Sequence, residues 1–215
     1  KALKKQHDSF EEKGCKMSDH GIEQIIPITK SKETLNKFFL KTLDGCLITE
    51  NEIHAWQYFL MLEFAKWNKE KGWTMQLHLG AIRNNNEKMY KEAGKDIGCD
   101  SIGDFSHARN LNIYFSCLNS SDNLPNIILY NSNPKENYVF STLAGNFFED
   151  GVAGKIKFGS AWWFLDSEQG MINQINALSE TGLFSRFIGM VTDSRSFLSF
   201  SRHDYFRRII CNLIG

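Results

Sequence analysis

Polar and aromatic residues stand at the C-terminal ends of four of the apolar segments that we interpret as strands. In chain order they are Asp19 and His20, His78, Trp162 and Trp163, and Asp193 with Arg195. A carboxylate can take up or relay a proton, and an arginine fork can hold a carboxylate or vicinal oxygens. The carboxyl ends of parallel strands meet on one face, where ligands bind. These side chains therefore predict one polar pocket.

The candidate pocket residues, and Arg83 after the second expected strand, also have purely structural interpretations. Asp193 is followed by Ser194 and could cap the turn after its strand. His78, on an apolar strand, fits a hydrogen-bonded core histidine, and Trp162 fits core packing because tryptophan buries a large area. Arg83 stands beside three asparagines, as a solvated loop arginine would. The prediction of a pocket therefore depends on the combination of these residues.

Short apolar runs alternate with helical patterns along the chain, as in βα units with a parallel sheet. We expect strands over 15–21, 73–80, 126–131, 155–164 and 187–193. A long helix is expected from the capping-box pair Thr49 and Glu52 to Gly72, where a glycine favours a helix end. Further helices are expected over 103–118, 136–148, 167–181 and 203–214. Five β units, each followed by a helix, fit an open doubly wound sheet or part of a (β/α)8 barrel.

Composition excludes several classes of protein. The 215 residues hold 25 Lys+Arg and 25 Asp+Glu, so no net basic field is available for nucleic acid or a membrane surface. Neither a GxGxxG nor a Walker-type loop occurs, which argues against a nucleotide site. The five cysteines are scattered without a CxxC pair, as expected for free thiols in the cytoplasm. We find no signal peptide and no apolar run long enough to span a bilayer, and we expect a cytoplasmic protein.

Four strings occur in a fixed order along the chain: SDHG, HLGAIRNNN, GSAWWFLD and TDSRSFLSFSRHDYFRR. Together they resemble the C-terminal half of uronate isomerase, the glucuronate/galacturonate isomerase of bacterial hexuronate breakdown, within the amidohydrolase superfamily. The resemblance covers essentially the whole chain. Its most specific part is the last string.

The resemblance implies an α/β fold in which residues 1–215 form a single domain, the C-terminal portion of a distorted (β/α)8 barrel from about the fourth to the eighth strand. It also implies interconversion of D-glucuronate with D-fructuronate, and of D-galacturonate with D-tagaturonate. Asp193 corresponds to the family's metal-associated, proton-handling aspartate. The other positions that the family uses around its substrate correspond to Arg195 and His78, which we assign to catalysis, and to Arg83, Trp162 and Asp19, which we assign to substrate binding.

The resemblance further implies a divalent metal, zinc or manganese, with Asp193 as one ligand. The family's metal site begins with a His-x-His pair, which this chain lacks, so the remaining ligands are expected in an N-terminal half. The chain opens on Lys1, which fits a fragment. The expected partner is a small hexuronate, with no nucleic acid and no membrane, and a homo-oligomer is possible.

Two hypotheses remain open at this point. In the first, the parent protein is a true isomerase and this fragment alone is inactive. In the second, the chain is a non-catalytic module with an incomplete barrel that binds a sugar acid or serves assembly. A half barrel has open strand edges, so we expect the chain to need its other half or a partner for stability. Arg202, Arg207 and Arg208 are expected to bind carboxylates of neighbouring elements.

Overall fold

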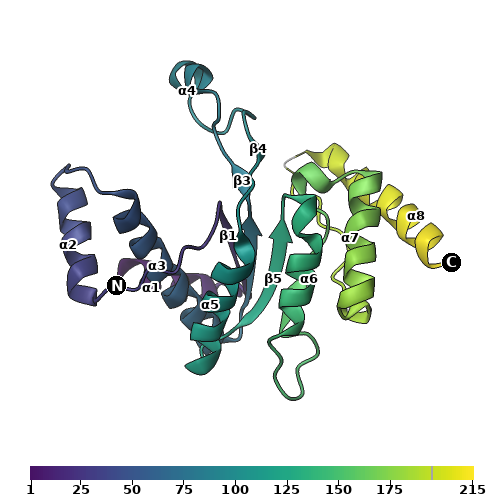
Figure 1. Cartoon of the computed structure of the whole chain (residues 1–215), viewed down its shortest axis with the longest axis horizontal. Coiled ribbons are helices and arrows are strands. Elements are labelled where there is room, and N and C mark those ends of the chain that lie inside the picture. Colours follow the sequence, from purple (N-terminus) through teal and green to yellow (C-terminus); the bar gives the residue numbers. More distant parts are fainter. Residues whose placement is uncertain (195) are drawn as a thin grey trace. The chain divides into compact units, whose positions relative to one another are not determined.

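The computed structural model describes residues 1–194 and 196–215 (Figure 1). Its first half contains α1 (Ala2–Glu12), β1 (Met17–Ile22), α2 (Lys32–Leu43), α3 (Glu50–Lys71), β2 (Thr74–Leu79), β3 (Ala81–Ile82), α4 (Glu87–Ala93) and β4 (Ser101–Ile102). The second half contains α5 (His107–Ser120), β5 (Asn126–Asn131), η1 (Pro134–Glu136), α6 (Asn137–Gly145), β6 (Ile156–Phe158), η2 (Trp163–Leu165), α7 (Glu168–Thr181), η3 (Phe184–Arg186), η4 (Phe197–Ser201) and α8 (Arg202–Ile214).

These elements divide into two compact units. The helical unit comprises Lys1–Ser18, Gln24–Met75 and Ser106–Asn126. The sheet unit comprises Asp19–Glu23, Gln76–Phe105 and Ile127–Gly215. The expectation of a single domain over 1–215 stays a prediction, because two such units can belong to one domain.

Helix α3 is the central helix of the helical unit, because α1, α2 and α5 each pack against it. Its start is fixed by the predicted capping box, in which the Thr49 side chain accepts from the Glu52 amide and the Glu52 carboxylate accepts from the Thr49 amide at 2.7 Å. It ends at Gly72, which adopts a φ of 67°. In the core of this unit the buried Tyr114 of α5 donates its hydroxyl to the Met61 carbonyl at 2.9 Å. That bond ties α5 to α3.

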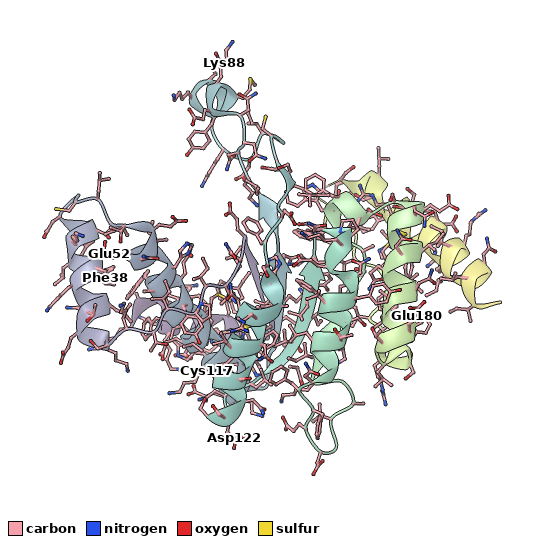
Figure 2. All side chains as sticks on the ribbon, viewed as in Figure 1. Phe38, Glu52, Lys88, Cys117, Asp122 and Glu180 are labelled. Atoms are coloured by element: carbon pink, nitrogen blue, oxygen red, sulfur yellow. The ribbon has the colours of Figure 1, made fainter. Side chains whose placement is uncertain are left out.

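The main sheet has the strand order β1-β2-β5-β6, and β5 and β6 are parallel, with Ile127 opposite Ile156. Helix α6 packs against β6 and α7, and α7 packs against α8. The antiparallel pair β3 and β4 extends away from the sheet and carries α4 at its tip, where Lys88 points outward (Figure 2). This arrangement confirms an α/β fold with parallel strands and helices.

The fifth expected strand, 187–193, is wrong: the described residues of that segment form no strand. Gly189 and Asp193 have φ values of 82° and 43°, outside the β region. The Val191 amide donates to the side-chain hydroxyl of Ser160 at 3.3 Å rather than to a neighbouring strand. An apolar run predicts burial, but a strand also needs a backbone partner.

The other expected elements are present with shifted boundaries. The strand expected over 155–164 is limited to β6, because the chain turns after Gly159 into η2, where Trp163 has a φ of 49°. The strand expected over 126–131 is β5 itself, and the helix expected over 103–118 begins later, at His107.

All five cysteines are free thiols, and Cys117 on α5 is exposed. In the part of the chain that the structure describes, no helix is both long enough and apolar enough to cross a membrane.

Candidate active site

A cleft of about 450 Å³ opens in the sheet unit, within the size range of small-molecule sites. It is lined by Arg83, Trp162, Trp163, Thr192, Asp193, Ser194 and Arg202. Four of the residues that the sequence or the resemblance predicts for the pocket therefore lie together: Arg83, Trp162, Trp163 and Asp193.

The carboxylate of Asp193 is held by a buried aromatic side chain. Trp162, which is 4% exposed, donates its indole Nε1–H to Asp193 Oδ2 at 2.6 Å. The backbone at Asp193 has a φ of 43°, an uncommon conformation for a residue other than glycine. Next to it, the Thr192 carbonyl accepts from Arg202 Nη1 at 3.1 Å. Contacts from two directions thus support the strained backbone that presents this exposed carboxylate.

Arg83 places a cation on another wall of the cleft. Its guanidinium lies 4.8 Å from the centre of the Trp163 ring, in cation–π geometry. Its Nη1 atom lies 3.9 Å from Asp96 Oδ1, and its side chain is 47% exposed. At that distance and exposure the ion pair is weak, so the guanidinium remains available for an anionic ligand.

His78 lies behind the cleft and contacts Trp162, with ring centres 4.6 Å apart. It is 8% exposed, and its Nδ1 lies 2.8 Å from Asp19 Oδ1. An ionised carboxylate can only accept, so Nδ1 carries the proton and donates it. Nε2 is buried and has no hydrogen-bond partner among the described residues. The prediction of a hydrogen-bonded core histidine is correct for Nδ1 and leaves Nε2 unexplained.

Tyr130 and Gln76 complete this polar group. The ring of Tyr130 stacks on that of His78 with centres 4.3 Å apart and planes 4° from parallel. The Tyr130 hydroxyl donates to Gln76 Oε1 at 2.7 Å, and Gln76 Nε2 donates to Asp19 Oδ2 at 3.3 Å. Burial raises the pKa of Tyr130 well above its usual range, and the charges of Asp19 and Asp193 raise it further. The hydroxyl therefore stays protonated and acts as a donor.

Sequence patterns missed Tyr130 and Gln76. One signal was present for Gln76: it stands two residues before His78 on β2, so both side chains lie on the same face of the strand. For Tyr130, the signal was a polar tip on an otherwise apolar strand. Arg195 lies outside the described residues, so its place in the pocket stays a prediction.

The basic helix α8 agrees in part with the expectation that its arginines bind carboxylates of neighbouring elements. Arg202 Nη1 forms an ion pair of 2.9 Å with Asp166 Oδ2, and the Tyr205 hydroxyl donates to Asp166 Oδ1 at 2.5 Å. Arg208 Nε lies 2.9 Å from Asp204 Oδ2, one helical turn away. Arg202 thus binds a carboxylate of a neighbouring segment, as expected, and also lines the cleft, whereas the partner of Arg208 lies on α8 itself. The expectation for Arg207 stays a prediction.

The residues of the cleft do not amount to a metal site by themselves. Outside residue 195, no group of three His, Cys, Asp or Glu side chains is placed to hold an ion, whereas a catalytic zinc usually has three protein ligands. Asp193 offers a single carboxylate. Zinc or manganese chemistry therefore has no complete ligand set among these side chains.

The chain resembles known proteins along its whole length. It is 50% identical over 214 residues to the uronate isomerase of Phocaeicola vulgatus, covering 100% of this chain and 46% of that protein. The crystal structure of uronate isomerase from Thermotoga maritima is 35% identical and superposes with a TM-score of 0.90, covering 100% of this chain and 46% of that one. The crystal structure of glucuronate isomerase from Caulobacter crescentus is 28% identical with a TM-score of 0.83, covering 97% of this chain and 42% of that one.

The chain thus spans about half the length of the curated relatives that it matches. The family model for glucuronate isomerase matches residues 1–215. With its cleft, its buried histidine and these matches, the chain belongs to the glucuronate isomerase family.

Proposed function

We propose that the protein containing this chain interconverts D-glucuronate with D-fructuronate and D-galacturonate with D-tagaturonate. The observation that carries this proposal is the cleft itself, in which the Asp193 carboxylate is fixed by Trp162 and the guanidinium of Arg83 lies on another wall. A hexuronate needs both groups, a base for its carbon-bound proton and a cation for its carboxylate.

The reaction moves a proton between two adjacent carbons. Asp193 removes the proton from C2 of the aldose while the C1 carbonyl oxygen gains one, which gives an enediol. Return of a proton to C1, with loss of the proton on the C2 hydroxyl, gives the ketose. General base catalysis of this kind contributes roughly 100- to 10,000-fold. Arg83 binds the substrate carboxylate, and Trp162 forms an apolar wall against the sugar.

We also propose that Asp193 contributes one ligand to a divalent ion, zinc or manganese, whose other ligands belong to the rest of the protein. When bound, such an ion would polarise the substrate carbonyl. The described side chains supply no group of three ligands, so this part of the proposal depends on residues outside this chain.

We propose that this chain forms the C-terminal portion of a (β/α)8 barrel, from about its fourth to its eighth strand. The main sheet, with the strand order β1-β2-β5-β6, would supply four of these strands, and the described residues of segment 187–193 form none.

One observation favours a second candidate, a module that binds a sugar acid without turning it over. The described residues contain no group of three metal ligands, and the carboxylate of Asp193, the only proposed base, is exposed to solvent. In that case the chain would bind hexuronates through Arg83 and leave them unchanged.

The test combines two measurements on the native protein. The intact mass of the native polypeptide is determined, and isomerase activity on D-glucuronate is assayed with added zinc or manganese. A mass about twice the 24.7 kDa of this chain, with activity, supports the isomerase. A mass of 24.7 kDa with hexuronate binding and no turnover supports the module and overturns the enzyme proposal.

A further inference from the structure

We infer that Tyr130 and Gln76 are positioning residues that hold His78 as a single tautomer, with Nδ1 protonated and Nε2 free to accept a hydrogen bond from a substrate hydroxyl. The arrangement of the four side chains stands on the geometry alone. Only the use of Nε2 by a hexuronate hydroxyl rests on the proposed function.

The four side chains form a closed circuit across three strands. His78 and Gln76 come from β2, Asp19 from β1 and Tyr130 from β5. Hydrogen bonds run from Tyr130 to Gln76 at 2.7 Å, from Gln76 to Asp19 at 3.3 Å, and from His78 to Asp19 at 2.8 Å. The stack of His78 on Tyr130 closes the circuit.

The chemistry of the donors and acceptors fixes the direction of every bond. Gln76 Oε1 can only accept, so the Tyr130 hydroxyl must donate to it, and this orients the Gln76 amide with Nε2 toward Asp19. Gln76 thereby occupies Oδ2 of Asp19, and Oδ1 accepts from His78 Nδ1. The half-exposed Asp19 carboxylate, at 51% side-chain exposure, is held in this orientation by two donors.

Tight packing keeps the Tyr130 ring in place. Tyr130 is fully buried, with its ring against His78 and against the backbone of Gly159. A Cβ atom at Gly159 would lie 2.7 Å from Cδ1 of Tyr130, closer than carbon atoms approach. The ring of Tyr130 therefore lies directly against the backbone of Gly159 on one side and the imidazole of His78 on the other.

The circuit leaves one buried polar atom of His78 without a partner in the described part of the chain, namely Nε2. Buried polar atoms are nearly always paired, so an unpaired one needs an explanation. With Nδ1 protonated, neutral Nε2 has a lone pair and can only accept. It fits a hydroxyl donor, which a sugar acid supplies and an anion lacking hydroxyls does not.

The direct test is the tautomer of His78, read from the imidazole ¹⁵N chemical shifts of the purified protein without any substrate. We expect the Nδ1-protonated form to dominate. Tyr130→Phe keeps the ring and the stack but removes the hydroxyl, so Gln76 is free to rotate. We expect the ratio of Nδ1-protonated to Nε2-protonated imidazole to fall about fivefold, the value of one ordinary hydrogen bond.

Tyr138→Phe is the matched control. Tyr138 also donates to a side-chain oxygen, Glu180 Oε2 at 2.8 Å, but lies on α6 at the surface. It should leave the His78 shifts unchanged. A second variant, Gln76→Met, removes both amide contacts at similar volume and should reproduce the shift. Unchanged His78 shifts in Tyr130→Phe and in Gln76→Met would overturn the inference.

In the complete enzyme, the bond between His78 Nε2 and a substrate hydroxyl contributes to binding, so Tyr130→Phe should raise KM for hexuronate about fivefold with a smaller change in kcat. A tautomer shift in a protein that turns over no hexuronate would support the positioning role and reject the proposed function. A rise in KM without any tautomer shift would reject the positioning role and keep the enzyme.

Discussion

The indole of Trp162 donates a hydrogen bond of 2.6 Å to the carboxylate of Asp193, across 31 positions of the chain. Trp162 is buried in a small core with Ala81, Ile128 and Tyr130, whereas Asp193 is exposed in the cleft. The orientation of the exposed carboxylate is thus set by a side chain that cannot move freely. A base with a fixed orientation is what proton transfer from carbon requires.

Replacing Asp193 by Asn should remove the base while keeping an acceptor for the Trp162 indole. We expect kcat of the complete enzyme to fall by roughly 100- to 10,000-fold, the usual contribution of a general base, with stability nearly unchanged. Steady-state kinetics on D-glucuronate is the measurement. Asp204→Asn, at the surface of α8 beside Arg208, is the matched control and should retain full activity. An Asp193→Asn variant with more than about a tenth of the activity would exclude this aspartate as the base.

Arg83 should act on binding more than on turnover. Arg83→Met keeps an apolar side chain against Trp163 but removes the cation, so we expect KM for hexuronate to rise about tenfold or more with a smaller change in kcat, since a charged hydrogen-bonding partner is lost. Arg208→Met, which breaks only a surface pair on α8, serves as control. An unchanged KM would mean that the substrate carboxylate binds elsewhere.

The sequence predicted those parts of the fold that short-range signals encode. The start of α3 at Thr49 and its end at Gly72 depend on side chains within a few residues, and both are confirmed. Helix α1 was missed because it buries none of its residues and is attached through polar contacts and through the His7 ring stacked on Trp73. Segment 187–193 was misassigned because its apolar residues are consistent with burial, while strand pairing depends on a neighbour that the sequence of the segment does not specify.

The candidate site shows the same distinction between short-range signals, which the sequence reveals, and long-range pairing, which it does not. Trp162 and Asp193 were found because each follows an apolar run, and the ends of such runs meet in the cleft. Arg83 was found only through the family resemblance, because its own surroundings indicate a solvated loop. Tyr130 was not found, because its role depends on which strands are neighbours and on the absence of a side chain at Gly159. Pairing between strands is a long-range property, and one sequence read by pattern does not give it.

Gly159→Ala tests the close approach of Tyr130. The added methyl group would overlap the Tyr130 ring, so we expect the free energy of unfolding to fall by about 1–3 kcal/mol, as overpacked cores do. Gly145→Ala adds the same methyl group at the end of α6, where nothing lies within 4 Å, and is the control. Urea denaturation of both variants gives the comparison. Equal stability of the two would show that β5 and β6 have room for the methyl group.

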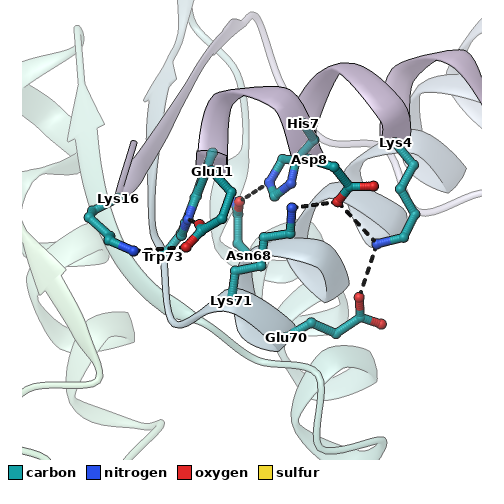
Figure 3. Close-up of polar contacts among 9 residues, drawn as sticks. All are labelled: Lys4, His7, Asp8, Glu11, Lys16, Asn68, Glu70, Lys71 and Trp73. Carbon is teal, nitrogen blue, oxygen red and sulfur yellow. Dashed lines mark hydrogen bonds and ion pairs between the residues drawn. The ribbon is translucent and has the colours of Figure 1, made fainter. Parts of the chain in front are cut away.

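Lowering the pH should release α1 from α3 in the helical unit. Figure 3 shows the contacts: Asp8 accepts from Lys71, Glu11 accepts from Lys16 at 2.8 Å and from the Trp73 indole, and His7 bonds Asn68. The bond from Lys71 lowers the pKa of Asp8, and the bonds from Lys16 and Trp73 lower the pKa of Glu11. Carboxylates with a lowered folded-state pKa stabilise the fold above their unfolded pKa values, about 3.9 and 4.3, and lose that contribution as the pH falls through the folded values.

Hydrogen exchange of the α1 amides, corrected for intrinsic rates, should therefore show constant protection from pH 7 to about 5 and a loss of protection below about pH 4, before α3 is affected. In the double variant Asp8→Asn, Glu11→Gln, protection of α1 should be weaker at pH 7 and should no longer fall in this range. Glu12→Gln, on the same helix but outside the contacts of Figure 3, should behave as the wild type. If the double variant lost α1 protection along the same pH curve as the wild type, these two carboxylates would not be what attaches the helix.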